Sequence, residues 1–144
     1  MKKSRPVILL LLAICIATAC KSYTKTLQDS VTAADETAAL SAMRTVGVAQ
    51  QTYSVSKEGK FATFDELVSA GYLDSRFNGE KPKIKGYVLT MAVSGKSEGD
   101  PSYTINADPE PQLKGRHFYL DSTTNVMRVN NSQVAGPSDT LLNQ

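Results

Sequence analysis

The sequence has no tryptophan, two cysteines and one histidine among its 144 residues. Two cysteines and one histidine are too few for the common zinc-binding patterns, in which several Cys and His side chains are the ligands. No long run of lysine and arginine is present, and the formal net charge is only +2, so the chain lacks the basic surface typical of nucleic-acid binding. No glycine-rich phosphate-binding motif occurs either. We therefore predict no metal site, no cofactor and no nucleic-acid partner.

The chain length favours a single domain with at most a tail, and so argues against an enzyme with a cleft between two lobes. Hydrophobic residues make up 41% and charged residues 21% of the sequence. Both fractions are close to those of globular proteins and disfavour a disordered chain.

The one long apolar run covers residues 7–17 and follows three basic residues, Lys2, Lys3 and Arg5. In a helix such a run rises about 16 Å, whereas the hydrocarbon core of a bilayer is about 30 Å thick. The run is therefore short for a membrane span and has the size of the apolar region of a signal peptide.

Small residues end this run just before a cysteine, in the order Ala17, Thr18, Ala19 and Cys20. The order resembles the bacterial lipobox, in which a signal peptidase cleaves before a cysteine whose thiol carries diacylglycerol. The resemblance implies cleavage after Ala19 and lipidation of Cys20. Two alternatives stay open: ordinary secretory cleavage, which would leave a free thiol on Cys20, and an uncleaved anchor.

Cysteine usage and charge agree with lipidation. Cys15 lies inside the apolar run and would leave with the signal peptide, and a lone Cys20 forms no internal disulfide. Without the three basic residues that precede the run, 13 basic residues face 14 acidic ones. Acyl chains on Cys20, rather than charge, would hold the protein on its membrane partner. Lys21, in place of Asp, favours the outer membrane if the cell is Gram-negative.

We expect four parts along the chain. Residues 1–19 are a signal peptide and residues 20–31 are the lipidated cysteine and a tether, although residues 21–31 fit a continuation of the following helix equally well. Residues 32–130 form one domain, and residues 131–144 a flexible C-terminal tail.

Apolar residues at helical spacing predict a helix over residues 33–56. Thr32 is expected to cap its start, with Asp35 and Glu36 near the positive end of the helix dipole. One helix side would pack on a sheet. Its apolar stripe consists of Ala39, Met43, Val46, Ala49 and Tyr53.

The rest of the domain predicts a second helix and a sheet. Thr63 and Glu66 have the spacing of a capping box and predict a short helix over residues 64–70. Beyond residue 86 the apolar period changes to two, and the short connections favour antiparallel pairing. The expected strands cover residues 87–93, 103–105, 116–121 and 126–129. The predicted fold is α+β, with a long and a short helix on a four-stranded antiparallel sheet.

His117 is the only candidate general base. A serine triad needs an acid behind the imidazole, and Asp121 lies about 13 Å further along the same extended strand. We therefore predict no catalytic residue and interpret His117 as a partly exposed strand residue.

Other charged groups carry weak signals. Lys81, Lys83 and Lys85 share one side of an extended segment, which fits either a solvated loop or contact with phosphate or glycan. Asp108 and Glu110 are a minimal calcium pattern that we do not favour.

Short motifs then follow one another in a characteristic order. They are Ala38-Ala39-Leu40-Ser41-Ala42-Met43-Arg44-Thr45, Ala49-Gln50-Gln51-Thr52-Tyr53, Gly59-Lys60-Phe61, Phe64-Asp65-Glu66-Leu67, Gly71-Tyr72-Leu73-Asp74, Gly86-Tyr87-Val88-Leu89 and Gly115-Arg116-His117-Phe118-Tyr119-Leu120-Asp121. This order resembles the globular part of bacterial type IV pilins and type II secretion pseudopilins, over residues 38–129.

The resemblance implies a pilin-like fold and a structural or interaction role in the bacterial cell envelope, without enzymatic activity. The loops at residues 94–101 and 108–115 are the expected contact surface. Pilins keep a longer apolar helix, of about 20 residues, that packs the fibre core; here the run is short and ends in a lipobox. The alternatives are a minor pilin or pseudopilin that retains its apolar segment, and a small envelope hydrolase or ligand-binding lipoprotein.

Overall fold

The computed structural model describes the backbone of residues 5–95 and 99–142, and the side chains from residue 28 onward within those ranges. The chain divides into two compact units, residues 1–33 and residues 34–144, and each is described by itself. The helices are α1 (Arg5–Ser56), α2 (Phe64–Ser69) and the 3-10 helix η1 (Ser75–Phe77). The strands are β1 (Lys83–Ile84), β2 (Tyr87–Ser94), β3 (Ser102–Pro109), β4 (His117–Asp121), β5 (Arg128–Asn130) and β6 (Thr140–Leu141).

Helix α1 begins earlier than the sequence pattern predicted. The helix expected over residues 33–56 is present, but residues 21–31 are also helical, which is the second of the two alternatives for that segment. The predicted cap at Thr32 is therefore wrong. The Thr32 hydroxyl instead donates to the carbonyl oxygen of Gln28 at 3.0 Å, so it sits inside the helix and bonds back to the preceding turn.

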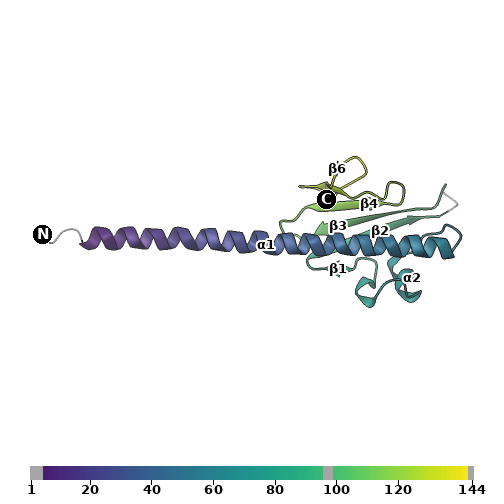
Figure 1. Cartoon of the computed structure of the whole chain (residues 1–144), viewed down its shortest axis with the longest axis horizontal. Helices are drawn as coiled ribbons and strands as arrows, with labels where there is room; N and C mark the ends of the chain where they lie inside the picture. Colours follow the sequence, from purple (N-terminus) through teal and green to yellow (C-terminus); the bar gives the residue numbers. More distant parts are fainter. Residues whose placement is uncertain (1–4, 96–98, 143–144) are drawn as a thin grey trace. The chain divides into compact units, whose positions relative to one another are not determined.

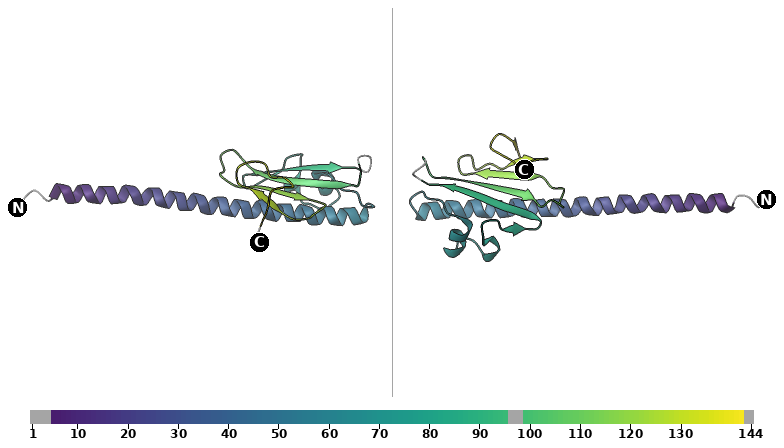
Figure 2. Two further views of the ribbon diagram at one scale, coloured as in Figure 1. Left: turned by 90° about the horizontal axis from the view of Figure 1, so that it is seen from above. Right: turned by 180° about the vertical axis from the view of Figure 1, so that it is seen from behind.

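Residues 34–56 of α1 lie along one side of an antiparallel sheet (Figures 1 and 2). The predicted stripe is confirmed, because Ala39, Met43, Val46 and Ala49 are buried and Tyr53 packs against the core. Alternate strand residues supply the other side of the core. They include Tyr87, Leu89, Tyr103, Ile105, Ala107, Phe118 and Leu120. The domain is thus α+β, with its core between helix and sheet.

The sheet has six strands in sequence order, and every neighbouring pair is antiparallel. The four predicted strands are its four central ones, with ends shifted by a few residues. The two extra strands, β1 and β6, lie at the edges and have two residues each. Segments that short show no alternation of apolar and polar residues, so the period-two pattern cannot reveal them.

A tight turn joins β1 to β2. Ile84 pairs with Tyr87, so only Lys85 and Gly86 form the loop. Both have positive φ angles, 53° and 79°, as a type I′ hairpin turn requires. Gly86 adopts this backbone without steric cost, whereas Lys85 does not. The turn holds Lys85 at the tip of the hairpin.

Helix α2 has the predicted capping box. The Glu66 amide donates to the Thr63 hydroxyl at 3.3 Å, and the Thr63 amide donates to the Glu66 carboxylate at 2.7 Å. Phe64 stacks on Phe77 of η1 with ring centroids 6.4 Å apart. These contacts fix the connection between α1 and the first strand.

The segment after β5, expected as a tail, carries strand β6 and several side-chain contacts. Ala135 is buried, and its carbonyl oxygen accepts a hydrogen bond from the Asn106 side chain at 2.7 Å. Asp139 accepts from the amide of Gly136 at 2.8 Å and from the side chain of Asn130 at 2.9 Å. The polar composition predicted a tail, whereas pairing of β6 with β5 and the hydrogen bond from Asn106, 29 residues before Ala135, tie this segment to the domain.

Gln50 is a fully buried polar side chain on the core side of α1. Its amide nitrogen donates to the carbonyl oxygen of Ala62 at 2.6 Å, and its amide oxygen accepts from the Ala62 backbone nitrogen at 3.0 Å. The Gln50 amide thus satisfies both backbone groups of Ala62, as the backbone of a neighbouring strand does in a sheet. It fastens the loop before α2 to the helix.

We predict that Gln50→Ala lowers the free energy of unfolding by about 2 kcal/mol, because both backbone groups of Ala62 lose their partner while buried. Gln51→Ala is the matched control. Gln51 is exposed, so its replacement should change stability by less than about 0.5 kcal/mol. Urea denaturation of the full chain measures both, and equal effects would contradict the bridging role.

Candidate functional site

The predicted processing residues Ala17, Thr18, Ala19 and Cys20 fall within the bounds of helix α1. Their side chains lie outside the described residues, so the lipidation of Cys20 and the cleavage after Ala19 stay predictions. In the part of the chain that the structure describes, no helix meets the length and hydropathy of a membrane span.

His117 has a carboxylate partner, but not the one considered from the sequence. Its Nδ1 atom lies 2.6 Å from the Asp108 carboxylate of the neighbouring strand. Asp121 instead accepts hydrogen bonds from the amides of Thr123 and Thr124 at 2.9 and 2.7 Å. The two residues lie nine positions apart on adjacent strands, and the pair follows from the register in which Ala107 of β3 pairs with Phe118 of β4.

The Asp108–His117 pair lies beside a shallow groove that Ser132 also lines. The Ser132 hydroxyl is directed to Asn130, at 3.4 Å. No hydroxyl group among the described side chains is hydrogen-bonded to His117. Nucleophilic catalysis needs the imidazole within hydrogen-bond reach of the attacking oxygen. The pair therefore corresponds to the acid and the base of a triad, and among the described side chains no nucleophile is hydrogen-bonded to it.

The three lysines predicted on one side of an extended segment do not act as one cluster. The Lys83 ammonium group is 2.6 Å from the Glu110 carboxylate, and its hydrogen bond holds the pKa of Glu110 below the ordinary value. Lys85 is at the hairpin tip, and Lys81 precedes β1. Lys83 is thus paired, which weakens the case for an anion site here.

Neighbouring acidic residues have structural partners. Asp65 accepts from the Gly79 amide at 2.7 Å, and Glu66 closes the capping box. Among the described residues no group of three or more His, Cys, Asp or Glu side chains is placed to hold a metal ion.

A polar cluster joins α1 to the start of β4. Glu36 accepts three hydrogen bonds from Arg116: from the backbone amide at 3.0 Å, from Nε at 3.0 Å and from Nη2 at 2.7 Å. These bonds raise the pKa of Arg116. The central carbon of its guanidinium group also lies 5.6 Å from the centre of the Phe118 ring. The cluster fixes the helix relative to the strand.

Tyr87 completes this cluster from β2. Its hydroxyl donates to the carbonyl oxygen of Arg116 at 3.0 Å. It occupies the space that a Cβ atom would need at position 115, so Gly115 permits the approach. Burial raises the pKa of Tyr87 strongly, with a further contribution from the nearby Glu36 carboxylate. The Gly86-Tyr87 and Gly115-Arg116 motifs therefore meet in space.

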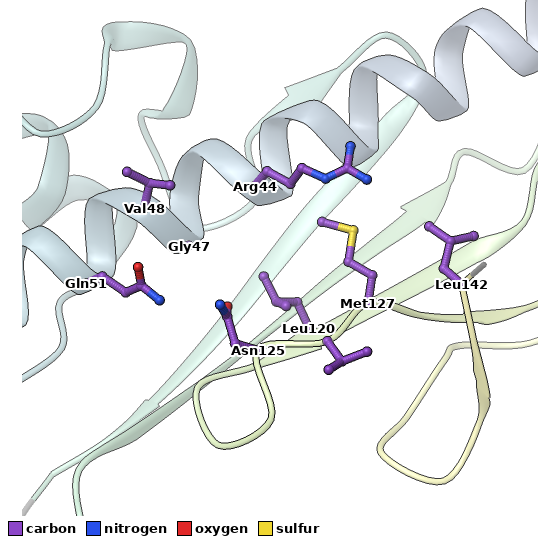
Figure 3. A pocket seen from close by; sticks show the side chains of 9 residues that line it. Arg44, Gly47, Val48, Gln51, Leu120, Asn125, Met127 and Leu142 are labelled. Atoms are coloured by element: carbon purple, nitrogen blue, oxygen red, sulfur yellow. The ribbon is translucent and has the colours of Figure 1, made fainter. Parts of the chain in front are cut away.

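A groove with a volume of about 500 Å³ lies between α1 and the turn after β4. We call it the α1–β4 groove (Figure 3). Its lining residues are Arg44, Gly47, Val48, Gln51, Leu120, Asn125, Val126, Met127 and Leu142. Sequence reasoning missed it because these residues come from separate elements. The only local signal is Gly47, an unfavourable residue in the middle of a helix.

We predict that Glu36 and Arg116 are energetically coupled by about 1.5 kcal/mol. The Glu36 side chain is 12% exposed and that of Arg116 is 43% exposed, which places the pair between a surface ion pair and a buried one. A double-mutant cycle with Glu36→Gln and Arg116→Met, read by urea denaturation, measures the coupling. The Lys83–Glu110 pair, in which the lysine side chain is largely exposed, is the control and should give a clearly smaller coupling. Equal coupling in both pairs would refute the cluster's role.

We also predict alkaline unfolding. Burial raises the pKa of Tyr87, Tyr103 and Tyr119 above the ordinary value of 10.0. The folded protein then holds these phenolic protons more tightly than the unfolded chain. Their stabilising contribution is complete below about pH 10 and is lost as the pH rises toward the folded-state pKa values. Melting temperatures measured from about pH 8 upward test this. Tyr87→Phe removes one ionisation and should flatten the decline; an unchanged slope would contradict the assignment.

Comparison with protein-family models, with curated proteins and with solved structures found no match for this chain.

Proposed function

We propose that this chain is a lipid-anchored, pilin-like protein of the bacterial cell envelope that acts as a structural or interaction module and not as an enzyme. The observation that carries the proposal is the sequence Ala17-Thr18-Ala19-Cys20, followed after residues 21–31 by a domain whose motifs resemble those of pilins. Acyl chains on Cys20 would supply stable membrane attachment, since two or more chains suffice for it.

The positions of the motif residues support the pilin-like part of the proposal. Ala39 and Met43 pack α1 on the sheet, and Gln50 fastens the loop before α2. Tyr87 and Arg116 hold two strands together. The pieces that carry the resemblance therefore cooperate in one helix-on-sheet domain. A head of this kind presents surface to partners, which fits an interaction role.

A second candidate is a minor pilin or pseudopilin that retains its apolar segment. One observation favours it: α1 begins at Arg5, so the apolar residues 7–17 belong to the same helical element as the residues that cover the sheet. A retained segment of this kind would attach the head without lipid.

Palmitate labelling in a bacterial host tests the anchor. We expect the wild-type chain to incorporate label and to sediment with membranes, and Cys20→Ala to do neither. Cys15→Ala is the matched control, because this cysteine lies in the segment that cleavage removes; it should label as the wild type does.

The mass of the mature protein separates the two candidates. Loss of residues 1–19 together with an added lipid mass supports the lipoprotein. Retention of residues 1–19 with an unmodified Cys20 supports the pilin or pseudopilin, and a Cys20→Ala chain that still labels and stays with membranes refutes the anchor.

A further inference from the structure

We propose that the α1–β4 groove binds the carboxyl-terminal end of a short apolar peptide, with the terminal carboxylate on Arg44. This inference gives the interaction role proposed above a partner of defined chemistry and rests on that role. It does not depend on the lipid at Cys20.

The groove has an apolar floor of suitable size. Leu120, Met127 and Leu142 line it from the sheet side, and Val48 from the helix. Its volume of about 500 Å³ falls within the range of pockets that hold small ligands. Apolar side chains of a ligand would be removed from water there, which is the main driving force for binding.

A positive charge lies at one end of the groove. Arg44 is exposed and, among the described residues, takes part in no ion pair with Asp or Glu. Figure 3 shows its guanidinium group above Met127, on the side of Leu142. A guanidinium matches a carboxylate with two parallel hydrogen bonds. Charge complementarity therefore favours an anionic ligand, and a carboxylate above all.

Two carboxamides lie toward the other end, on Gln51 and Asn125 (Figure 3). Each carboxamide has an NH₂ group that donates and an oxygen that accepts. These groups can pair with the C=O and the N–H of a peptide bond. The hydrocarbon tail of a fatty acid would cover these amides without replacing their hydrogen bonds to water, at a cost in free energy. The two amides thus favour a peptide over a fatty acid.

The spacing of these groups fits a short peptide. Arg44 and Gln51 are separated by two helical turns, a rise of about 10 Å. Three extended residues span about the same length. One peptide end can therefore reach Arg44 while its backbone two to three residues earlier lies near Gln51.

The backbone that carries the amide on the sheet side is fixed by the turn after β4. Asn125 has a φ angle of 51°, and its backbone nitrogen donates to the Asp121 carbonyl oxygen at 3.0 Å. The Asp121 carboxylate binds the amides of Thr123 and Thr124 in the same turn. A turn fixed in this way loses little conformational freedom on binding.

Gly47 keeps the groove open. A Cβ atom at this position would lie 3.4 Å from a methyl carbon of Leu120 and 4.0 Å from the Asn125 amide oxygen. An alanine there makes ordinary contacts, whereas a leucine side chain would extend into the space that a ligand needs.

Fluorescence anisotropy with the full chain in lipid nanodiscs tests the proposal. The probe is fluorescein-labelled Ala-Leu-Leu with a free carboxylate, compared with the same peptide amidated. We expect the free acid to bind about tenfold more tightly. Arg44→Gln should abolish this preference, and Gly47→Leu should weaken binding of both peptides. Arg76→Gln, a surface arginine outside the groove, is the control and should leave the preference intact.

The proposal is overturned by equal affinity for acid and amide, by a preference that survives Arg44→Gln, or by no binding at about 5 mM peptide. Octanoate, a short fatty acid, is tested as a competitor for the probe. If octanoate displaces the probe at the same concentration at which unlabelled Ala-Leu-Leu does, the peptide proposal is also overturned. Circular dichroism of Arg44→Gln confirms that this variant is folded. Palmitate labelling of Cys20 is independent of these outcomes, so failure here is distinguishable from failure of the anchor.

Discussion

Burial of one side of helix α1 against the sheet is the contact on which the head of this protein depends. Met43 and Val46 from the helix meet Leu89 and Ile105 from the central strands, and all four are fully buried. Core packing of this kind supplies most of the stabilisation of a domain this small, and loss of any large side chain from it leaves a cavity.

Polar contacts then fix the position of the helix along the sheet, which apolar burial alone leaves loosely defined. Gln50 holds the loop before α2, and Glu36 holds Arg116 at the start of β4. The two contacts lie near opposite ends of residues 34–56. Because hydrogen bonds demand short distances and good angles, a shift of the helix by one turn would break both. The fold therefore obtains stability from apolar packing and precision from a few buried polar groups.

The side chains that usually signal catalysis serve the architecture here. Asp65 and Glu66 cap helices and turns, Asp121 fixes the turn after β4, and Lys83 is paired with Glu110. In the α1–β4 groove, three polar side chains lie around an apolar floor. They are Arg44, Gln51 and Asn125. The groove is the basis for proposing a peptide as the partner, whereas the proposed interaction role rests on the sequence Ala17-Thr18-Ala19-Cys20 and the pilin-like motifs that follow it.

The amino-acid sequence by itself determined the elements that repeat a local pattern. The apolar stripe of α1, the capping box at Thr63 and the four central strands each have a period or a spacing that short stretches of chain record. Tertiary structure decided whatever joins residues distant in sequence. Strand register brings His117 to Asp108, and the two short edge strands are defined by their pairing with β2 and β5. The groove belongs to this second class, because Arg44 and Asn125 acquire a common surface only when α1 packs on the sheet.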